Sequence, residues 1–156
     1  MPIQLVVENL NASIDDKVVL HDLAVTAQAG HILALMGKGG CGKSTFLRVI
    51  NRMAEEGGAV VSGHIMLDNS SIFMQDISLP RQKVGMVFTE PVLFAGNILG
   101  NITAGLRLQG IKKKQKLEEC AEETLGYMGI LEEFRDLLYT DASYLNRSQA
   151  QLVCIA

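Results

Sequence analysis

The stretch of sequence that decides the fold is ILALMGKGGCGKSTFLRVI, which runs from Ile32 to Ile50. Its first part, Ile32–Met36, is apolar at every position, a pattern typical of a strand buried on both faces of a parallel sheet. Four glycines follow within Gly37–Gly42. From Phe46 to Met53 the apolar side chains recur at helical spacing. The stretch therefore predicts a strand, a glycine loop and a helix, in that order.

The loop in the middle of this stretch matches the pattern G-x-x-x-x-G-K-[ST] in full. Glycines permit turns that a Cβ forbids, and they let the backbone approach a phosphate closely. The N–H groups around the second half of the loop then form an anion-binding nest, which the positive end of the following helix reinforces. The residues of the predicted site are Gly37, Lys38, Gly39, Gly40, Cys41, Gly42, Lys43, Ser44 and Thr45.

Two side chains complete the chemistry of a nucleotide site. The Lys43 ammonium would reach the β- and γ-phosphates, and the Ser44 hydroxyl would ligate Mg²⁺. Cys41 and Lys38 are interpreted as a small tolerated residue and a solvated lysine, so only their backbone takes part. The alternative is a glycine-rich turn that matches the pattern by chance. The predicted strand before the loop and helix after it favour the nucleotide site.

Composition excludes several other classes of protein. The 156 residues carry 14 Lys+Arg against 17 Asp+Glu, a net charge of −3, which argues against a nucleic-acid-binding coat and a polybasic membrane anchor. Hydrophobic residues make up 48% and charged residues 20%, as expected of one globular domain. No apolar run approaches the ~20 residues of a membrane-spanning helix. Three cysteines without CxxC spacing indicate a reduced compartment and no zinc site.

The remaining pattern predicts further strands and helices. Alternating or continuous apolar runs predict strands, and apolar residues spaced three to four apart predict amphipathic helices. The last residues, Leu152–Ala156, are apolar, which is an unusual ending for a domain. The predicted strands are Ile3–Val7, Leu20–Val25, Val60–Leu67 (closed by a turn at Asp68-Asn69) and Val84–Phe88, and the predicted helices are Lys112–Met128 and Leu131–Leu138.

A catalytic carboxylate pair is not evident. Asp68 follows an apolar strand, but Asn69 stands beside it where a hydrolase needs a glutamate, and the pair is typical of a turn. Glu132-Glu133 lies in a helical pattern. The basic run Lys112–Lys116 is offset by nearby glutamates and is interpreted as a solvated helix face, with a partner-docking patch as the alternative.

With the phosphate loop in place, nearly the whole chain resembles the ATP-binding cassette of ABC transporters, and in particular the ATP-binding subunits of phosphate importers. The similar stretches are Val7–Leu10, Gly37–Met53, Gly63–Asp68, Arg81–Phe88, Asn101–Ile111, Asp141 and Leu145–Ala156. The resemblance implies an α/β, P-loop NTPase-like fold with an antiparallel β portion and a helical subdomain. It also implies one truncated domain over 1–156, with a β/P-loop core portion at 1–88 and a helical portion at 89–150.

The resemblance implies partners and cofactors as well. A chain of this family binds ATP with Mg²⁺, pairs head to tail with a second ATP-binding subunit and drives inner-membrane permease subunits from the cytoplasmic face. It has no nucleic-acid partner. In this family the strand into the phosphate loop pairs with strands of a C-terminal part that this chain lacks. We therefore expect Ile32–Met36 to have unpaired edges and the apolar C-terminal segment to be exposed.

Four departures from the family pattern lead us to expect nucleotide binding without hydrolysis. Ile14 offers only apolar contact where the family stacks an aromatic ring on adenine. Thr89 replaces the glutamine that senses Mg²⁺. Leu145–Gln149 reads LNRSQ where the family has LSGGQ, so Arg147 adds bulk where backbone should approach phosphate. The chain also ends before the strand that bears the catalytic acids and the switch histidine.

Three alternatives remain open at this point. The chain could be a non-catalytic module that docks on a permease or on an intact cassette subunit, or a remnant without function. A small P-loop kinase is the least favoured reading, because such an enzyme needs a cluster of arginines over its acceptor site. The arginines that follow the helix predicted over Phe46–Met53 are scattered singly, at Arg81, Arg107, Arg135 and Arg147.

Overall fold

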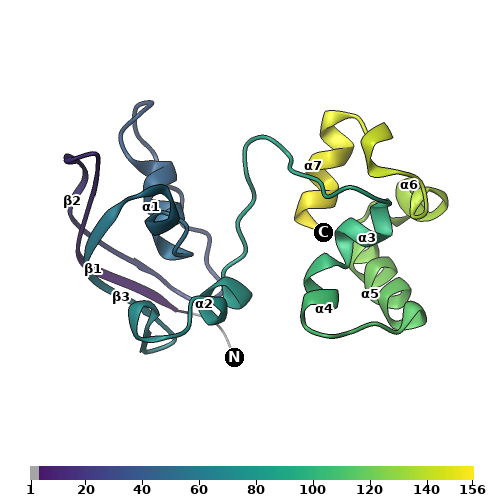
Figure 1. The fold of residues 1–156 in the computed structure, drawn as a ribbon, viewed down its shortest axis with the longest axis horizontal. Coiled ribbons are helices and arrows are strands. Elements are labelled where there is room, and N and C mark those ends of the chain that lie inside the picture. Colours follow the sequence, from purple (N-terminus) through teal and green to yellow (C-terminus); the bar gives the residue numbers. More distant parts are fainter. Residues whose placement is uncertain (1–3) are drawn as a thin grey trace. The chain divides into compact units, whose positions relative to one another are not determined.

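The computed structural model describes residues 4–156, which form two units. The first unit extends to Met86, and the second unit covers Val87–Ala156. The first unit contains the sheet and the helix that follows the glycine loop, whereas the second unit consists of helices and the loops between them (Figure 1). These names, first unit and second unit, are kept below.

The sheet of the first unit is antiparallel. β1 (Leu5–Ile14) and β2 (Lys17–Ala27) form a hairpin. β3 (Val60–Leu67) pairs with the other edge of β1, and the short β4 (Ser70–Ser71) pairs with β3. The strand order is therefore β2-β1-β3-β4.

Most of the sheet follows the sequence prediction. The strand predicted over Leu20–Val25 is confirmed as part of the longer β2, and the one over Val60–Leu67 is confirmed as β3. The strand predicted over Ile3–Val7 begins outside the described residues, and its described part continues as β1. Asp68 and Asn69 have φ values of 51° and 62°, so the predicted turn between β3 and β4 is confirmed.

A bulge brings β1 and β3 into close contact at Gly63. The register shifts between Glu8 and Asn11, and Asn9 within the bulge has a φ of 50°. A Cβ on Gly63 would lie 2.4 Å from the Asn9 carbonyl oxygen, and Gly63 itself has a φ of 113°. Both the space and the backbone conformation therefore require glycine at this position.

The helix that follows the loop, α1 (Lys43–Ile50), packs on this sheet through Phe46, Val49 and Ile50. It confirms the helix predicted from Phe46, although the chain leaves helical geometry at Asn51 instead of continuing to Met53. The apolar contact between α1 and the sheet forms the core of the first unit. Buried sheet residues in this core are Val7, Leu10, Ala12, Leu20, Ile65 and Leu67.

Two arginines fasten the end of α1. Arg52 has a left-handed φ of 59°, and its guanidinium donates to Glu55 Oε2 at 2.9 Å and to the Gln75 carbonyl at 3.2 Å. The hydrogen bond to Glu55 raises the pKa of Arg52. Arg81, on the short helix α2 (Ser78–Lys83), donates to the Arg52 carbonyl at 2.9 Å. The Arg81 bond satisfies a backbone carbonyl just after the end of α1, and the Arg52 bonds tie this point to Glu55 and Gln75.

Two predicted strands are wrong. Ile32–Met36 and Val84–Phe88 run without a β-ladder partner among residues 4–156. Ile32 is 100% exposed and Met36 is 86% exposed, the opposite of the predicted burial, although Leu35 packs partly against the first core. An apolar sequence becomes a buried strand only where a neighbouring strand supplies hydrogen-bond partners. The expectation that Ile32–Met36 has unpaired edges is confirmed.

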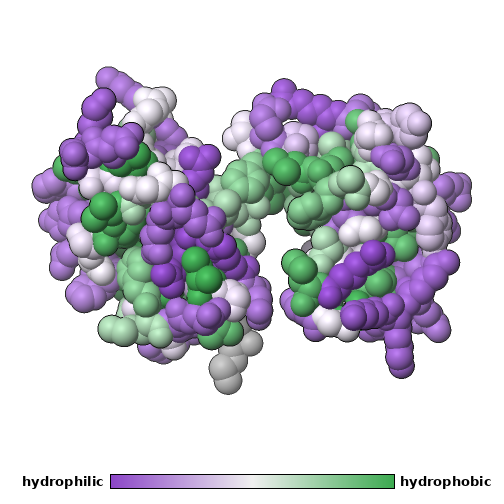
Figure 2. Space-filling view, viewed as in Figure 1, coloured by the Kyte–Doolittle hydropathy of each residue, from purple (hydrophilic) through white to green (hydrophobic). Residues whose placement is uncertain are grey.

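The segment that leads from α2 into the second unit also carries exposed apolar side chains. Val87 is 49% exposed, Val92 65% and Phe94 67%. This segment, teal in Figure 1, shows as apolar surface in Figure 2.

The second unit is a bundle of short helices. None of the helices that the structure describes is long and apolar enough to cross a bilayer. The helices are α3 (Ile98–Ile102), α4 (Ala104–Leu108), α5 (Lys114–Tyr127), α6 (Leu131–Phe134) and α7 (Arg147–Ile155). The buried residues of their core are Ile98, Leu99, Ala121, Leu125, Phe134, Leu138, Ala142 and Val153.

Both predicted helices of this region are confirmed. The helix predicted over Lys112–Met128 is α5, and that over Leu131–Leu138 is α6 followed by a 3-10 turn to Leu137. We expect from the sequence that the apolar C-terminal segment is exposed. This is wrong for the side of α7 that faces the core of the second unit. Val153 in α7 is only 4% exposed, because the helix turns this side chain into the second core.

The loop before α7 closes back on the start of α3. Asn97 and Asp141 form an isolated β-bridge, and the Leu99 N–H donates to the Leu138 carbonyl at 2.8 Å. Hydrogen bonds from the side chain and backbone of Ser143 lower the pKa of Asp141. The chain that precedes α7 is thus tied to the bundle by backbone bonds.

Candidate functional site

The glycine loop of the first unit leads directly into α1. Cys41 donates its N–H to the Lys38 carbonyl at 3.3 Å, which closes a tight turn within the loop. The loop residues Gly37–Cys41 are exposed, whereas Gly42 is buried. The loop therefore stands open on one side and rests on the sheet through its last glycine.

Gly42 sets the angle at which the loop enters the helix. It is the N-cap residue of α1 and has a left-handed φ of 95°. A Cβ here would lie 2.8 Å from Leu20 Cδ2 and 2.9 Å from the Val19 carbonyl oxygen of β2. Because both the conformation and the space exclude a side chain, the glycine that the motif predicts is required by the packing of the loop on β2.

Lys43 folds back over the loop that precedes it. Its Nζ donates to the Gly37 and Lys38 carbonyl oxygens, each at 2.8 Å, and lies 3.5 Å from Cys41 Sγ. The ammonium is thereby held at the open side of the loop and is not extended into solvent. This is the position from which it can exchange carbonyl oxygens for the oxygens of a bound phosphate.

The first turn of α1 offers free hydrogen-bond donors next to this ammonium. The Phe46 N–H donates to the Gly42 carbonyl at 2.8 Å, while the N–H groups of Lys43, Ser44 and Thr45 have no backbone acceptor among residues 4–156. No acidic side chain occupies this turn. Together with the positive end of the helix dipole, these groups fit a phosphate.

The same turn provides one hydroxyl suited to a magnesium ion. Ser44 is exposed at the second position of α1, beside the Lys43 side chain. Mg²⁺ in phosphate sites takes few protein ligands and completes its shell with phosphate oxygens and water. The residues present therefore fit Mg²⁺ bound together with a nucleotide.

Ile14 lies at the end of β1 and packs partly against the first core. It supplies apolar contact, as the sequence indicates. Its side chain cannot stack on a base as an aromatic ring does.

Thr89 and Arg147, both singled out from the sequence, lie in the second unit, where the structure brings them together. Thr89, Arg147, Ser148, Gln151 and Leu152 line a hollow of about 430 Å³. The Gln151 side-chain amide donates to the Phe88 carbonyl at 3.0 Å, which fastens the Thr89 segment to α7.

The stretch that replaces the signature motif starts α7 with a complete capping box. The Asn146 side chain accepts from the Gln149 N–H at 2.9 Å, and the Gln149 side chain accepts from the Asn146 N–H at 3.2 Å. The start of α7 is therefore well formed.

Sequence reasoning missed one contact at this helix start. Arg147 Nη2 lies 2.6 Å from Glu90 Oε1. The two residues are 57 positions apart, and both are single charges in otherwise neutral surroundings, so no local pattern could have paired them. Because both side chains are largely exposed, the pair adds little stability, but it occupies the Arg147 guanidinium.

Comparison with known proteins identifies the family. Residues 20–156 match the family described as ABC transporter. This chain belongs to the ABC transporter family. The match includes the glycine loop, α1 and the whole second unit, so the phosphate loop and the start of α7 both lie within it.

Two similar proteins are ATP-binding proteins of phosphate import. The chain is 37% identical over 153 residues to phosphate import ATP-binding protein PstB 1 of Vibrio parahaemolyticus, covering 96% of this chain and 56% of that protein. It is 38% identical over 152 residues to PstB of Borreliella burgdorferi, covering 96% of this chain and 58% of that protein. The chain spans a little more than half the length of these ABC relatives.

Solved structures show the same fold. A bacterial Atm1-family ABC exporter with ATP bound matches with a TM-score of 0.79 at 23% identity, covering 99% of this chain and 27% of that one. CbiO1 of Clostridium perfringens, part of the ABC transporter complex cbiONQ, also gives 0.79 at 24% identity, covering 99% and 60%. The predicted α/β cassette fold is therefore confirmed.

Proposed function

We propose that this chain is the ATP-binding subunit of an ABC importer of phosphate and that it holds Mg-ATP through Gly37–Thr45. The observation that carries the proposal is the position of Lys43, whose ammonium is held on two loop carbonyls beside the free N–H groups of α1. Identity of 37–38% to phosphate import ATP-binding proteins supports the choice of transporter.

In this proposal each part of the loop has one task. The N–H groups of the first turn of α1 donate to phosphate oxygens, and Lys43 leaves the loop carbonyls to neutralise the terminal phosphates. Ser44 presents its hydroxyl to the metal ion. Bound Mg²⁺ supplies further charge neutralisation at the phosphate oxygens. Gly42 keeps these donors at their angle, since its packing on β2 fixes the start of α1.

We further propose that the 156 residues hold nucleotide without turning it over. Thr89 provides no amide group for a metal-bound water, and Arg147 fills a position where a glycine would let backbone approach phosphate. Arg147 is also engaged by Glu90. A phosphate-release assay with Mg-ATP should stay at the level of the Lys43→Ala variant, and release above that level would contradict this part.

The proposal includes an arrangement in the cell. Residues 1–88 form the nucleotide-binding core portion, and residues 89–150 form the helical portion. The chain works with inner-membrane permease subunits and a second ATP-binding subunit, as a peripheral protein on the cytoplasmic face of the membrane. The similarity to phosphate import ATP-binding proteins supports these partners.

Calorimetry with Mg-ATP tests the proposed site. We expect binding heat with the wild-type chain and none with Lys43→Ala. Lys38→Ala is the matched control, because Lys38 is an exposed loop lysine whose backbone carbonyl, and not its side chain, takes part in the loop. Identical heats for wild type and Lys43→Ala would refute the nucleotide site.

A second candidate function is a non-catalytic module that docks on a permease or an intact cassette subunit. The exposed Val92 and Phe94 favour it, because apolar side chains in an irregular segment are common at protein interfaces. In that case co-purification with these partners should survive Lys43→Ala. Loss of co-purification in that variant would favour the nucleotide-dependent subunit.

A further inference from the structure

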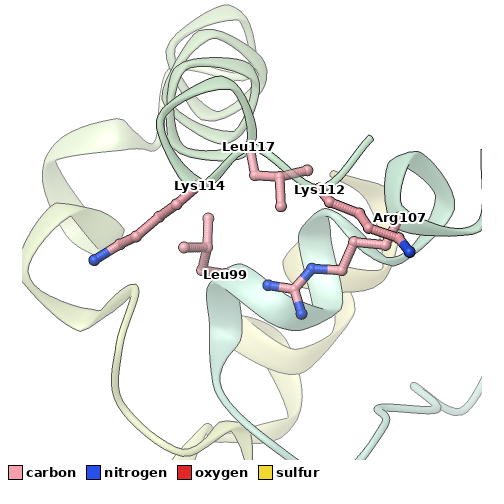
Figure 3. A pocket seen from close by; sticks show the side chains of 5 residues that line it. All are labelled: Leu99, Arg107, Lys112, Lys114 and Leu117. Carbon is pink, nitrogen blue, oxygen red and sulfur yellow. The ribbon is translucent and has the colours of Figure 1, made fainter. Parts of the chain in front are cut away.

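A basic pocket of about 360 Å³ lies in the second unit, among α3, α4 and α5. Its lining residues are Leu99, Arg107, Lys112, Lys114 and Leu117 (Figure 3). None of these residues belongs to the phosphate loop or to α7. The pocket is therefore a separate feature of the molecule, and it contains part of the basic run for which the sequence left two interpretations open.

The structure divides the cations of this pocket into two kinds. Lys114 is engaged locally: its Nζ lies 3.6 Å from Glu118 Oε1 and 5.0 Å from the centre of the Tyr139 ring. Tyr139 also donates its hydroxyl to Glu118. This cation thus has a carboxylate and an aromatic ring as neighbours within its own part of the fold.

Arg107 and Lys112 are not engaged in this way. Neither has a carboxylate oxygen within ion-pair distance or a side-chain hydrogen bond among residues 4–156. Both side chains are exposed. The pocket thus keeps an excess of positive charge, which is stabilised when an anion binds.

The floor of the pocket is apolar. Leu99 is 3% exposed and Leu117 is 4% exposed. In Figure 3 the two leucine side chains face each other, and the Arg107 side chain runs from α4 toward Leu99. A ligand in this space would contact hydrocarbon on one side and a guanidinium on the other.

We propose that this pocket binds a small organic anion, a phosphate or carboxylate carried on a short apolar body. The planar guanidinium of Arg107 matches the two oxygens of such a group, and Lys112 adds charge. The leucine floor takes the apolar part. The volume lies within the range of small-molecule sites, and inorganic phosphate alone would leave the floor unused.

Titration calorimetry of the full chain at low ionic strength tests the proposal with three probes: hexyl phosphate, hexanol and inorganic phosphate. We expect hexyl phosphate to bind more tightly than either of the other two. Arg107→Gln should weaken it about tenfold, the effect of losing one charge-assisted contact. Lys113→Gln is the matched control, because Lys113 is an adjacent exposed lysine outside the pocket, and we expect a change below about twofold. Circular dichroism confirms that both variants are folded.

A second arm distinguishes a free anion from a lipid headgroup. Vesicles of phosphatidylglycerol are compared with vesicles of phosphatidylcholine in a co-sedimentation assay. Binding to the anionic vesicles that Arg107→Gln reduces and Lys113→Gln spares would support the pocket and identify lipid as the source. Equal weakening by both variants in both arms, or hexyl phosphate binding no tighter than inorganic phosphate, would overturn the proposal. Because the phosphate loop is itself proposed to bind phosphate groups, both arms are repeated with the Lys43→Ala chain, so that the remaining binding belongs to the pocket, which no phosphate-loop residue lines.

Discussion

In the second unit, short helices bury their apolar side chains against one another, and α7 begins with a full capping box. In the first unit, the antiparallel sheet and α1 also form a core, but Ile32–Met36 has no ladder partner among residues 4–156. A helix satisfies its backbone within its own segment, whereas a strand depends on a neighbour. The two units therefore differ in whether their backbone groups find hydrogen-bond partners within the same unit.

This difference affects the proposed nucleotide site, because the phosphate loop directly follows the unpaired segment. The phosphate loop is flanked on its N-terminal side by an unpaired segment with Ile32 100% exposed, and on its C-terminal side by α1, whose apolar face is buried. The geometry of the loop consequently depends on α1 and β2, through Gly42 and Lys43. Four predictions test this contrast, from the largest expected effect to the smallest.

Phe134→Ala should have the largest effect, because this ring is 0% exposed in the second core. Removal of a buried aromatic side chain costs about 3–5 kcal/mol in the free energy of unfolding. Hydrogen exchange read by mass spectrometry should be faster across the helices of the second unit and unchanged in β1–β3. Phe46→Ala, at a ring that is 3% exposed in the first core, should give the reverse pattern. Faster exchange in both units from either variant would show that they unfold together and would break the comparison.

Gly42→Ala should destabilise the first unit by about 2 kcal/mol, the order of cost of a strained backbone position. The added Cβ would meet the Val19 carbonyl oxygen at 2.9 Å in a left-handed backbone conformation. Urea unfolding followed by far-UV circular dichroism measures the loss. Gly39→Ala is the control, because no atom lies within 4 Å of a Cβ placed there. Equal stability of the two variants would mean that the loop does not rest on β2.

Asn146→Ala should cost about 1 kcal/mol, the usual cost of losing an N-cap side chain. The lost contact is the 2.9 Å hydrogen bond from the Gln149 N–H. Thermal unfolding should show the decrease for Asn146→Ala. Ser148→Ala in the same turn should not show it, because Ser148 is exposed and takes no part in the capping box. If both variants unfold at the wild-type temperature, the capping box does not hold the start of α7.

Ile32→Lys should change the free energy of unfolding by less than about 0.5 kcal/mol, as is usual for an exposed side chain. It should nevertheless slow aggregation, because charge on an unpaired extended segment blocks edge-to-edge pairing. Light scattering at a fixed protein concentration measures this rate. Val18→Lys is the control: Val18 is 67% exposed, but its strand, at the edge of the sheet, is paired with β1. If both variants slow aggregation equally, exposed apolar surface in general drives aggregation, and the unpaired segment has no special role.

The sequence was sufficient where structure depends on local pattern. The glycine loop, α1, α5 and the turn at Asp68-Asn69 follow from glycine positions and residue spacing within a few turns of chain. It was insufficient for α3 and α4, which are five residues long each and carry too short a pattern to show a period. It also missed α2, where Pro80 lies in the first turn of the helix.

The larger error concerns segments whose burial depends on distant partners. Ile32–Met36 has the composition of a buried strand, yet composition says nothing of whether a neighbouring strand is present. The candidate site shows the same division. The motif predicts Gly42 and Lys43 as site residues, whereas the contacts of Gly42 with β2 and the pairing of Arg147 with Glu90 join residues far apart in the chain.

The most direct test of the account follows the backbone amide signals of Lys43, Ser44 and Thr45 by nuclear magnetic resonance during titration with Mg-ATP. These three amides have no backbone acceptor in the described chain and are proposed to donate to phosphate oxygens. The account predicts large, saturable shifts at these positions in the wild type, retained in Lys38→Ala and lost in Lys43→Ala. Absence of shifts in the wild type, or shifts confined to the second unit, would contradict a nucleotide site at this loop.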